Sequence, residues 1–379
     1  MRNTIDAVSA PGVARAIERV LDREGIPGCS VALIDRNGVR WADGFGFSDL
    51  RSGQTATAAT RYHLFSGTKV FTATAVMQLM NEGCIALNDD IGNHVFEAAH
   101  LTGVTIERLL SHQSGLRDSM RAFLAVHFPA EPVPTANEAL AMYPLRQRGT
   151  PGTRVAYANV NYALLGALIT RASGLPFEQF IRMHVLARCS SAAEFDSGGD
   201  WDANDFATGY IDRWDPMRAL LALLHPAVAR RIYRDRIGRR IELAEFSLST
   251  AAIGGLVGSV LDFAPFVQSH LADDGRLLPS ALLLRMQSVV ARGAAGVESR
   301  VGVGLGWKHG VVGERSFLNH EGGGPGFTSE MRLYPADGLG VVLAMNAMQM
   351  PRTMRVAHQL CEVVRAAAVV MNEEDIRGG

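Results

Sequence analysis

The two ends of this chain carry the residue patterns of β-strands, whereas the long stretch between them carries those of helices and loops. Near the amino terminus, residues 29–35 and 39–47 flank an Arg-Asn-Gly turn, which predicts a β-hairpin. Near the other end, residues 300–347 hold four more extended segments, and a helical pattern follows from Pro351. We therefore expect an α+β fold, an α/β sandwich whose antiparallel sheet is formed by both termini and flanked by helices, with a mostly helical domain inserted.

The expected domain boundaries follow from this division. Residues 1–65 and 293–379 would form one discontinuous sheet domain, and residues 66–292 would form the helical domain, with a ligand site between the two. Residues 214–246 stand apart because they are rich in both Leu and Arg. Their pattern is typical of an amphipathic surface helix pair, and a lid over the site or a contact between subunits is the alternative.

Charge and cysteine usage narrow the classes of function. A formal net charge of −1 gives no sign of the basic face that nucleic acid or an acidic membrane would require. The four cysteines lie far apart, without CxxC or HExxH motifs, so we expect buried free thiols and neither a metal site nor a cofactor. The chain has no apolar segment of membrane-spanning length and no signal-peptide pattern at its start, which favours a cytoplasmic location.

The segment FSGTKVF, residues 65–71, places Ser66 three residues before Lys69 at the start of an amphipathic helical pattern. Serine is a favoured N-cap, so a purely structural cap is one interpretation. The other is a nucleophile with its base, because the two side chains would lie one turn apart and the helix dipole favours developing negative charge. The chain has only two lysines among its 37 basic residues, and lysine, unlike arginine, can lose its proton in a protein.

Two further segments carry candidate functional residues. In YANVNYALLG, Tyr157 and Asn159 lie just before a helical pattern; a rim aromatic is the simple interpretation, and a base whose proton is drawn off by Lys69 is the alternative. In NHEGGGPGF, His320 precedes glycines that let a strand pass close to a ligand and present backbone N–H groups. A glycine-rich hairpin bend would explain the same residues without a ligand.

The order of these motifs resembles the penicillin-recognising serine hydrolases. FSGTK, LLSHQSGL, YANVNYALLG, AAIGGLVGSVLDFAPF, NHEGGGPGF and VVLAMNA follow one another as in that family, from about Arg15 to Asn346. The likeness is greatest to the class C β-lactamase branch and its esterase relatives, the family VIII carboxylesterases, and its D-aminopeptidase relatives. The resemblance implies the β-lactamase/transpeptidase-like fold.

The resemblance also implies roles for individual residues. Ser66 would be the nucleophile that becomes acylated, Lys69 would help to activate it, and Tyr157 would act as the shared general acid and base. Asn159 would orient Lys69 and the acyl side chain of the substrate. Gly323, which follows His320-Glu321-Gly322, would supply a backbone N–H to the oxyanion hole together with that of Ser66. In SHQSG, His112 is interpreted as structural.

The sequence departs from the β-lactamases at one motif. His320-Glu321-Gly322 stands where those enzymes have Lys-Thr-Gly, and a mostly neutral histidine binds the carboxylate of a β-lactam less well than a lysine does. A rival third motif is KHG at 308–310, which contains the other lysine. We rank it second because it directly follows GLGW and lacks the downstream Gly-Pro-Gly-Phe.

These residues predict a serine hydrolase that acts through an acyl-enzyme on small carboxylic esters. A β-lactamase, a D-aminopeptidase or DD-peptidase type of amide hydrolase, and an acyltransferase of the same fold are the alternatives. A non-catalytic binding protein is disfavoured, because such a module has no need of Ser66, Lys69 and Tyr157 together. The expected partner is a small-molecule ester or amide, and the sequence leaves homo-oligomerisation open.

Overall fold

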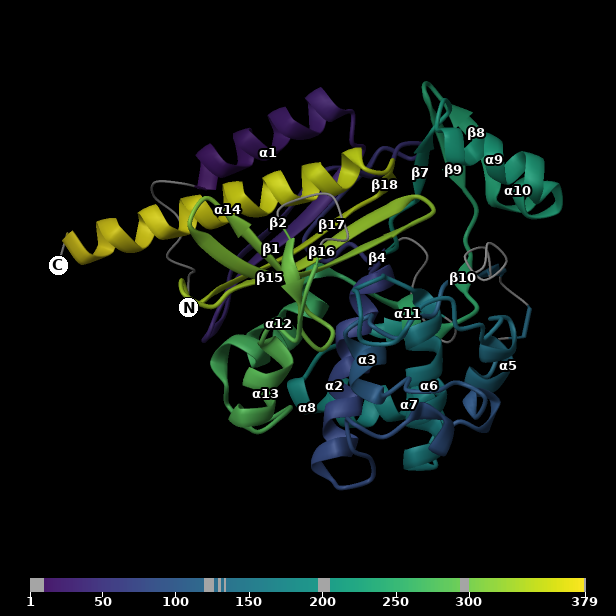
Figure 1. Ribbon diagram of the computed structural model, residues 1–379. Helices are drawn as coiled ribbons and strands as arrows, with labels where there is room; N and C mark the ends of the chain where they lie inside the picture. Colours follow the sequence, from purple (N-terminus) through teal and green to yellow (C-terminus); the bar gives the residue numbers. More distant parts are fainter. Residues whose placement is uncertain are drawn as a thin grey trace.

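Strands from both ends of the chain share one antiparallel sheet, as the sequence predicts (Figure 1). The structure is a computed structural model that describes residues 10–118, 126–128, 131–132, 134–196, 205–293 and 300–377. The predicted hairpin is formed by β1 (Gly28–Asp35) and β2 (Gly38–Asp49). On its other side β1 pairs with β17 (Leu339–Met345), with Val31 opposite Leu343. The amino-terminal hairpin is therefore closed onto the carboxyl-terminal strands.

Within the described residues the sheet has nine strands in the order β12-β13-β14-β15-β16-β17-β1-β2-β3. The central strands β1 and β17 are buried almost throughout, which explains why their sequences are continuously apolar rather than alternating. The remaining strands are β3 (Gln54–Thr55), β12 (Ala291–Arg292), β13 (Arg300–Val303), β14 (Lys308–Val312), β15 (Arg315–Gly324) and β16 (Phe327–Tyr334).

Two terminal helices cover one face of this sheet, α1 (Ala10–Glu24) and α14 (Arg352–Arg377), which pack against each other (Figure 1). Their apolar side chains form a core with the sheet that includes Ile17, Leu343 and Leu360. We call this the outer face.

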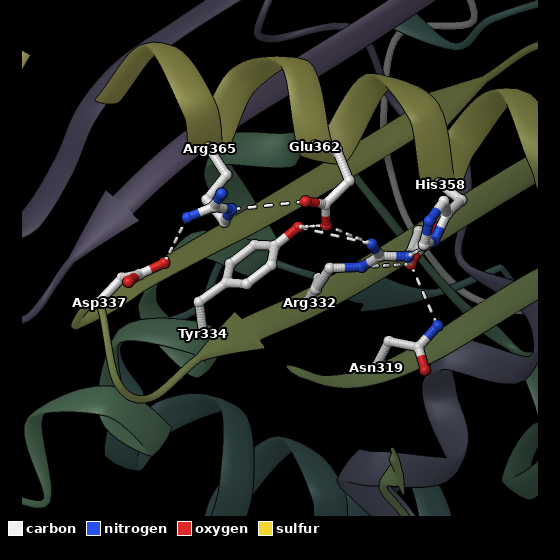
Figure 2. Close-up of polar contacts among 8 residues, drawn as sticks. Asn319, Arg332, Tyr334, Asp337, His358, Glu362 and Arg365 are labelled. Carbon is white, nitrogen blue, oxygen red and sulfur yellow. Dashed lines mark hydrogen bonds and ion pairs between the residues drawn. The ribbon is translucent and has the colours of Figure 1, made fainter. Parts of the chain in front are cut away.

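A buried polar network also joins α14 to the outer face (Figure 2). Arg332 of β16 forms an ion pair with Glu330 and hydrogen bonds to Glu362 and His358 of the helix, at 3.1 and 2.8 Å. Tyr334 donates a hydrogen bond of 2.7 Å to Glu362. Because Arg332 and Glu330 are almost fully buried, this network fixes the helix at a defined position on the sheet.

The opposite face of the sheet carries α12 (Val260–Ala272) and, beyond it, the helical middle of the chain (Figure 1). A second apolar core fills this side. The helices of the middle segment are α2 (Thr68–Asn81), α3 (Ile106–Leu110), α5 (Ala136–Ala141), α6 (Asn159–Ser173), α7 (Phe177–Phe180), α8 (Ala187–Cys189), α11 (Ala251–Gly254) and α13 (Ser280–Gln287). Three short 3-10 turns, η1 (Phe65–Gly67), η2 (Ile91–Asn93) and η3 (Phe96–Ala98), and a π-helical segment, η4 (Ile181–Leu186), accompany them.

Short strands pair within the middle segment and with the residues just before it. One small sheet has the order β4-β11-β6 and another pairs β10 with β5. Their bounds are β4 (Tyr62–His63), β5 (Val126–His127), β6 (Glu194–Phe195), β10 (Ser247–Leu248) and β11 (Leu256–Gly258). The sequence predicts this inserted helical region correctly, and the domain boundaries at 65/66 and 292/293 stay a prediction.

Residues 214–246 are only partly a helix pair. The pair consists of α9 (Pro216–Leu224) and α10 (Pro226–Ile232), and a hairpin of β8 (Tyr233–Ile237) and β9 (Arg240–Leu243) follows. The helical interpretation of the second half is therefore wrong. Gly238 takes the positive φ of 58° that the hairpin turn requires, and β9 finds a partner in β7 (Tyr210–Asp212), which also pairs with β18 (Ala347–Met348). A role for this segment as a lid or subunit contact stays a prediction.

Two other expectations can be compared with the structure. Cys29, Cys189 and Cys361 are buried free thiols, but Cys84 is exposed, so the expectation of burial is wrong for that residue. It lies in the exposed turn that follows α2. Among the described residues, no helix combines the length and apolar character needed to span a lipid bilayer.

Candidate active site

Ser66 lies in the single turn η1, directly before α2. The N-cap of α2 is Gly67, so the interpretation of Ser66 as the cap residue of this helix is wrong. Its Oγ instead lies 3.0 Å from Lys69 Nζ and accepts a hydrogen bond of 2.9 Å from Tyr157 Oη. The helix is not amphipathic either, because residues 68–79 are buried on every side between the sheet and the other helices.

Phe65 sets the direction of the turn. It has a positive φ of 46°, an uncommon conformation for a residue with a side chain, and is almost fully buried. Its ring stacks on His63 at 5.1 Å between centroids and occupies the space in which a side chain at Gly324 would lie. The packed ring therefore holds the backbone in this conformation immediately before Ser66.

Lys69 is completely buried, and its Nζ also donates a hydrogen bond of 2.9 Å to the backbone oxygen of Ile253 in α11. Burial lowers the pKa of its ammonium group well below the usual range, and the positive charge of Lys308 lowers it further, against a smaller opposing effect of Asp118. The neutral amine is thereby favoured. A neutral amine 3.0 Å from a hydroxyl can accept its proton.

Tyr157 lies in the loop before α6, with 36% of its surface exposed. Lys69 Nζ lies 5.3 Å from the centre of its ring, and Lys308 Nζ lies 4.9 Å from the same point. Both lysines of the chain therefore contact one tyrosine. Lys308 supplies the positive charge beside this tyrosine, because burial favours the neutral amine of Lys69, and a nearby positive charge favours the phenolate form, which can act as a base.

Residues 111–115, the SHQSG segment, support the loop that carries Tyr157. The backbone oxygen of His112 accepts a hydrogen bond from Ala156 N, and its Nδ1 accepts one from Ala158 N, at 2.8 and 3.3 Å. Its ring packs against Tyr157 at 4.4 Å between centroids. Burial, followed by the charges of Lys69 and Lys308, lowers the pKa of His112 well below its usual value. A neutral imidazole engaged with the backbone acts as a support for the loop.

Asp118 is a functional candidate that the sequence did not reveal. Its carboxylate accepts hydrogen bonds from the backbone N–H groups of Asn159 and Val160, at 2.8 and 2.9 Å, and so caps the start of α6. The cap fixes the helix that begins two residues after Tyr157. No local pattern could have identified it, since Asp118 lies 41 residues before Asn159.

Asn159 is the first residue of α6. Its predicted role in orienting Lys69 stays a prediction. Among the hydrogen bonds of the described residues, Lys69 Nζ bonds Ser66 and Ile253, and none joins it to Asn159.

The glycine-rich strand β15 runs alongside η1. His320 is buried, its Nδ1 lies 3.0 Å from the backbone oxygen of Glu321, and its ring lies 6.4 Å from that of Tyr157. Burial, and then the charges of Lys308 and Lys69, lower its pKa well below the usual value. At Gly322 a Cβ atom would lie 2.0 Å from the backbone oxygen of Leu64, so only glycine fits there. The predicted oxyanion role of Gly323 stays a prediction.

Lys308, which belongs to the rival KHG motif, also reaches the site. It is the first residue of β14 and pairs with Asn319, the residue before His320. Its Nζ lies 2.8 Å from Glu321 Oε2, and the two side chains are only 10% and 13% exposed. The sequence presented the two motifs as alternatives, but neighbouring strands bring both to the same place.

Comparisons with known proteins match most of the chain. A model of the Beta-lactamase family matches residues 13–362. Protein flp of Staphylococcus aureus (strain MW2) is 30% identical over 176 residues, which cover 45% of this chain and 35% of that protein. The Beta-lactamase of Escherichia coli (strain K12) is 26% identical over 262 residues, which cover 68% of this chain and 60% of that protein. The chain spans about a third of the length of the first curated relatives it matches.

Solved structures share the fold over nearly the whole chain. An octameric penicillin-binding protein homologue from Pyrococcus abyssi superposes with a TM-score of 0.77 at 24% identity, covering 96% of this chain and 78% of that one. A D-amino acid amidase from Ochrobactrum anthropi SV3 superposes with a TM-score of 0.76 at 21% identity, covering 96% and 99%. At identities of 24% and 21%, this likeness shows a shared fold and nothing beyond it.

Proposed function

The chain belongs to the beta-lactamase family, whose members are serine hydrolases, and we propose that it hydrolyses small carboxylic esters through an acyl-enzyme. One observation carries the proposal. Ser66 Oγ lies within hydrogen-bonding distance of both Lys69 Nζ and Tyr157 Oη, at 3.0 and 2.9 Å. A serine hydroxyl this close to two groups that can exchange protons is equipped as a nucleophile.

Acylation begins with attack of Ser66 Oγ on the ester carbonyl. The hydroxyl proton passes to the Lys69 and Tyr157 pair, and the bond from carbon to the leaving alkoxide breaks as the pair returns a proton to that oxygen. Backbone N–H groups of Ser66 and Gly323 stabilise the negative charge on the carbonyl oxygen. The products of this half-reaction are the alcohol and a Ser66 acyl ester.

Deacylation runs the same chemistry with water. Tyr157 takes a proton from the attacking water, and Ser66 Oγ recovers its proton as the carboxylic acid leaves. The exposure of Tyr157 supports this role, since water can reach its hydroxyl while Lys69 remains buried.

The preference for esters is supported by the neutral character of His320. A β-lactam carries a carboxylate that a fixed positive charge would bind, and the pKa of His320 is well below its usual value, so this residue supplies none. Lys308 is the observation that favours a second candidate, hydrolysis of β-lactams or of D-aminoacyl amides, because its Nζ lies 4.9 Å from the ring of Tyr157. Transfer of the acyl group to an alcohol or amine in place of water would need no other residues.

The test compares Ser66→Ala with the wild-type protein on 4-nitrophenyl butyrate, a chromogenic cephalosporin and a D-alanyl amide. We expect turnover of the butyrate ester to be fastest in the wild type and to be lost in Ser66→Ala. Ser288→Ala is the matched control, because its hydroxyl bonds only the Leu284 backbone oxygen among the described residues, at the end of α13. Unchanged ester turnover in Ser66→Ala would exclude the mechanism. A wild-type rate that is higher with the cephalosporin than with the butyrate ester would make β-lactams the preferred substrate.

A further inference from the structure

Lys308 and Glu321 form an ion pair beside the nucleophile that the steps above do not use. Lys308 Nζ lies 2.8 Å from Glu321 Oε2, and both side chains are largely removed from water. Charges in such a position are weakly screened, so the pair has a strong effect on its near surroundings. The carboxylate also comes from the residue directly after His320, so it is built into the same strand as the third motif.

The pair lies close to Tyr157 and, through it, to the nucleophile. Lys308 Nζ is 4.9 Å from the ring centre of Tyr157, whose hydroxyl bonds Ser66 Oγ. Its charge is also one of the causes that lower the pKa values of Lys69 and His320. The ammonium group is therefore part of the electrostatic environment of the site.

Three other described groups lie close to Tyr157 and add no positive charge. Lys69 from α2, His112 from the SHQSG segment and His320 from β15 have pKa values well below their usual ranges, so each favours its neutral form. Asp118 carries a negative charge and is engaged by the start of α6. Among the described residues at this tyrosine, the positive charge of Lys308 is thus matched by a carboxylate 2.8 Å away.

We propose that the Lys308–Glu321 ion pair selects substrates by charge, so that the site accepts an uncharged acyl group and disfavours one that carries a carboxylate. This inference rests on the proposed function and specifies its substrate class. The field of a close pair falls off faster with distance than that of a single charge. Lys69 and Tyr157 lie close enough to the ammonium group of Lys308 for its charge to act on them. A substrate carboxylate farther from the pair would interact with two nearly cancelling charges.

The experiment measures kcat/KM for mono(4-nitrophenyl) succinate relative to 4-nitrophenyl butyrate. The two esters share a leaving group and differ in a terminal carboxylate. Glu321→Gln removes the carboxylate and leaves the positive charge of Lys308 uncompensated. We expect the succinate to butyrate ratio to rise about tenfold, the order expected for a unit charge several ångströms from a bound carboxylate. Lys308→Gln should lower the ratio by a similar factor, and the double variant should return it to near the wild-type value.

A matched control uses another ion pair. Glu97→Gln makes the same substitution in an ion pair with Arg171, at 2.7 Å. Arg171 lies twelve residues after Asn159 in α6, which places it about 18 Å along the helix at a rise of about 1.5 Å per residue. The ratio should not change in this variant. Circular dichroism and thermal melting of each variant report whether it is folded.

Equal ratios in Glu321→Gln, Lys308→Gln and the wild type would overturn the inference and leave the pair a structural one. A wild-type preference for the succinate ester would overturn it as well. Binding of the two esters to Ser66→Ala, measured by calorimetry with and without Glu321→Gln, gives the same comparison without turnover. Absence of ester turnover therefore counts against the proposed function alone, and the binding ratio decides the inference on its own.

Discussion

Tyr157 Oη donates a hydrogen bond of 2.9 Å to Ser66 Oγ across 91 residues of chain. Each partner lies just before a buried helix, Ser66 before α2 and Tyr157 before α6, and the two helices pack against each other. The positions of both side chains are therefore set by one helix contact. Asp118 and His112 fix the second of these helices and its preceding loop, so the site is held by the helical core.

Tyr157→Phe removes the hydroxyl and keeps the ring. We expect kcat for 4-nitrophenyl butyrate to fall about 10²- to 10⁴-fold, the usual contribution of a general acid and base. The melting temperature should change little, because the residue is 36% exposed and the ring keeps its contact with His112. Tyr233→Phe is the control, since it makes the same change in β8, outside the site. A kcat within threefold of the wild type would remove Tyr157 from the mechanism.

Lys308 should control the pH dependence of the reaction through Lys69. Activity requires neutral Lys69, so kcat/KM rises with pH as this amine loses its proton. The charge of Lys308 disfavours a second positive charge nearby and lowers the pKa of Lys69. Lys308→Gln should therefore raise that pKa and move the acidic limb of the pH profile to higher pH, and Glu321→Gln should move it to lower pH. Limbs that stay in place, or that move in the opposite directions, would contradict this coupling.

Gly322→Ala tests the close approach of β15 to the turn that carries Ser66. Because the new Cβ would lie 2.0 Å from the backbone oxygen of Leu64, one of the two segments must move. We expect a loss of kcat of tenfold or more, since misplacement by about 1 Å can cost a catalytic site about 10²-fold. Gly12→Ala is the control, because a Cβ there meets no atom within 4 Å. Full activity in Gly322→Ala would show that this strand does not position the nucleophile.

His270 should make the protein sensitive to acid. Its ring lies buried between Phe266 and Trp307, neither of its nitrogens has a hydrogen-bond partner among the described residues, and burial lowers its pKa to about 3. The unfolded chain has a histidine pKa near 6.5, so between about pH 6.5 and 3 it binds more protons than the folded protein, and stability falls as pH falls.

His270→Leu removes this linkage with a side chain of similar size. We compare the free energy of unfolding of the variant with that of the wild type at each pH. This difference should shift in favour of the variant by about 2–3 kcal/mol between pH 8 and pH 4.5, because pH 4.5 lies about two units below the pKa of an unfolded histidine, which corresponds to about 2.7 kcal/mol. Urea denaturation at the two pH values measures this difference. A difference between the proteins that does not depend on pH would contradict it.

The contacts that the sequence indicates most directly are those between residues close together in the chain. Ser66 and Lys69 are three residues apart and meet, and the Arg-Asn-Gly turn makes the expected hairpin. The sequence does not indicate the contacts of Asp118 and Glu321, because their partners, the start of α6 and Lys308, depend on tertiary packing and on strand register.

The errors have the same origin. Residues 68–81 were expected to be amphipathic, but neighbours from both sides cover α2, and that depends on the whole fold. In the second half of 214–246, pairing with β7 overrides the helical pattern.

The network under α14 should contribute to the stability of the protein. Arg332 and Glu330 are buried together, and Arg332 bonds α14, which covers the face of the sheet opposite to the helical region (Figure 1). Arg332→Met leaves the Glu330 carboxylate buried without its guanidinium, and we expect the free energy of unfolding at pH 8 to fall by about 3–5 kcal/mol. Glu330→Met together with Arg332→Met should cost less than Arg332→Met alone, because no buried charge remains.

The pH dependence of this loss has a definite sign. Burial raises the pKa of Glu330, and removal of Arg332 raises it further, so the folded variant takes up a proton at a pH where the unfolded chain is still ionised. Its deficit relative to the wild type should therefore shrink as pH falls from 8 to 5. Urea denaturation at both pH values, with ester turnover measured on the same samples, checks the prediction. A deficit that grows on acidification would mean that Glu330 is not the group left uncompensated.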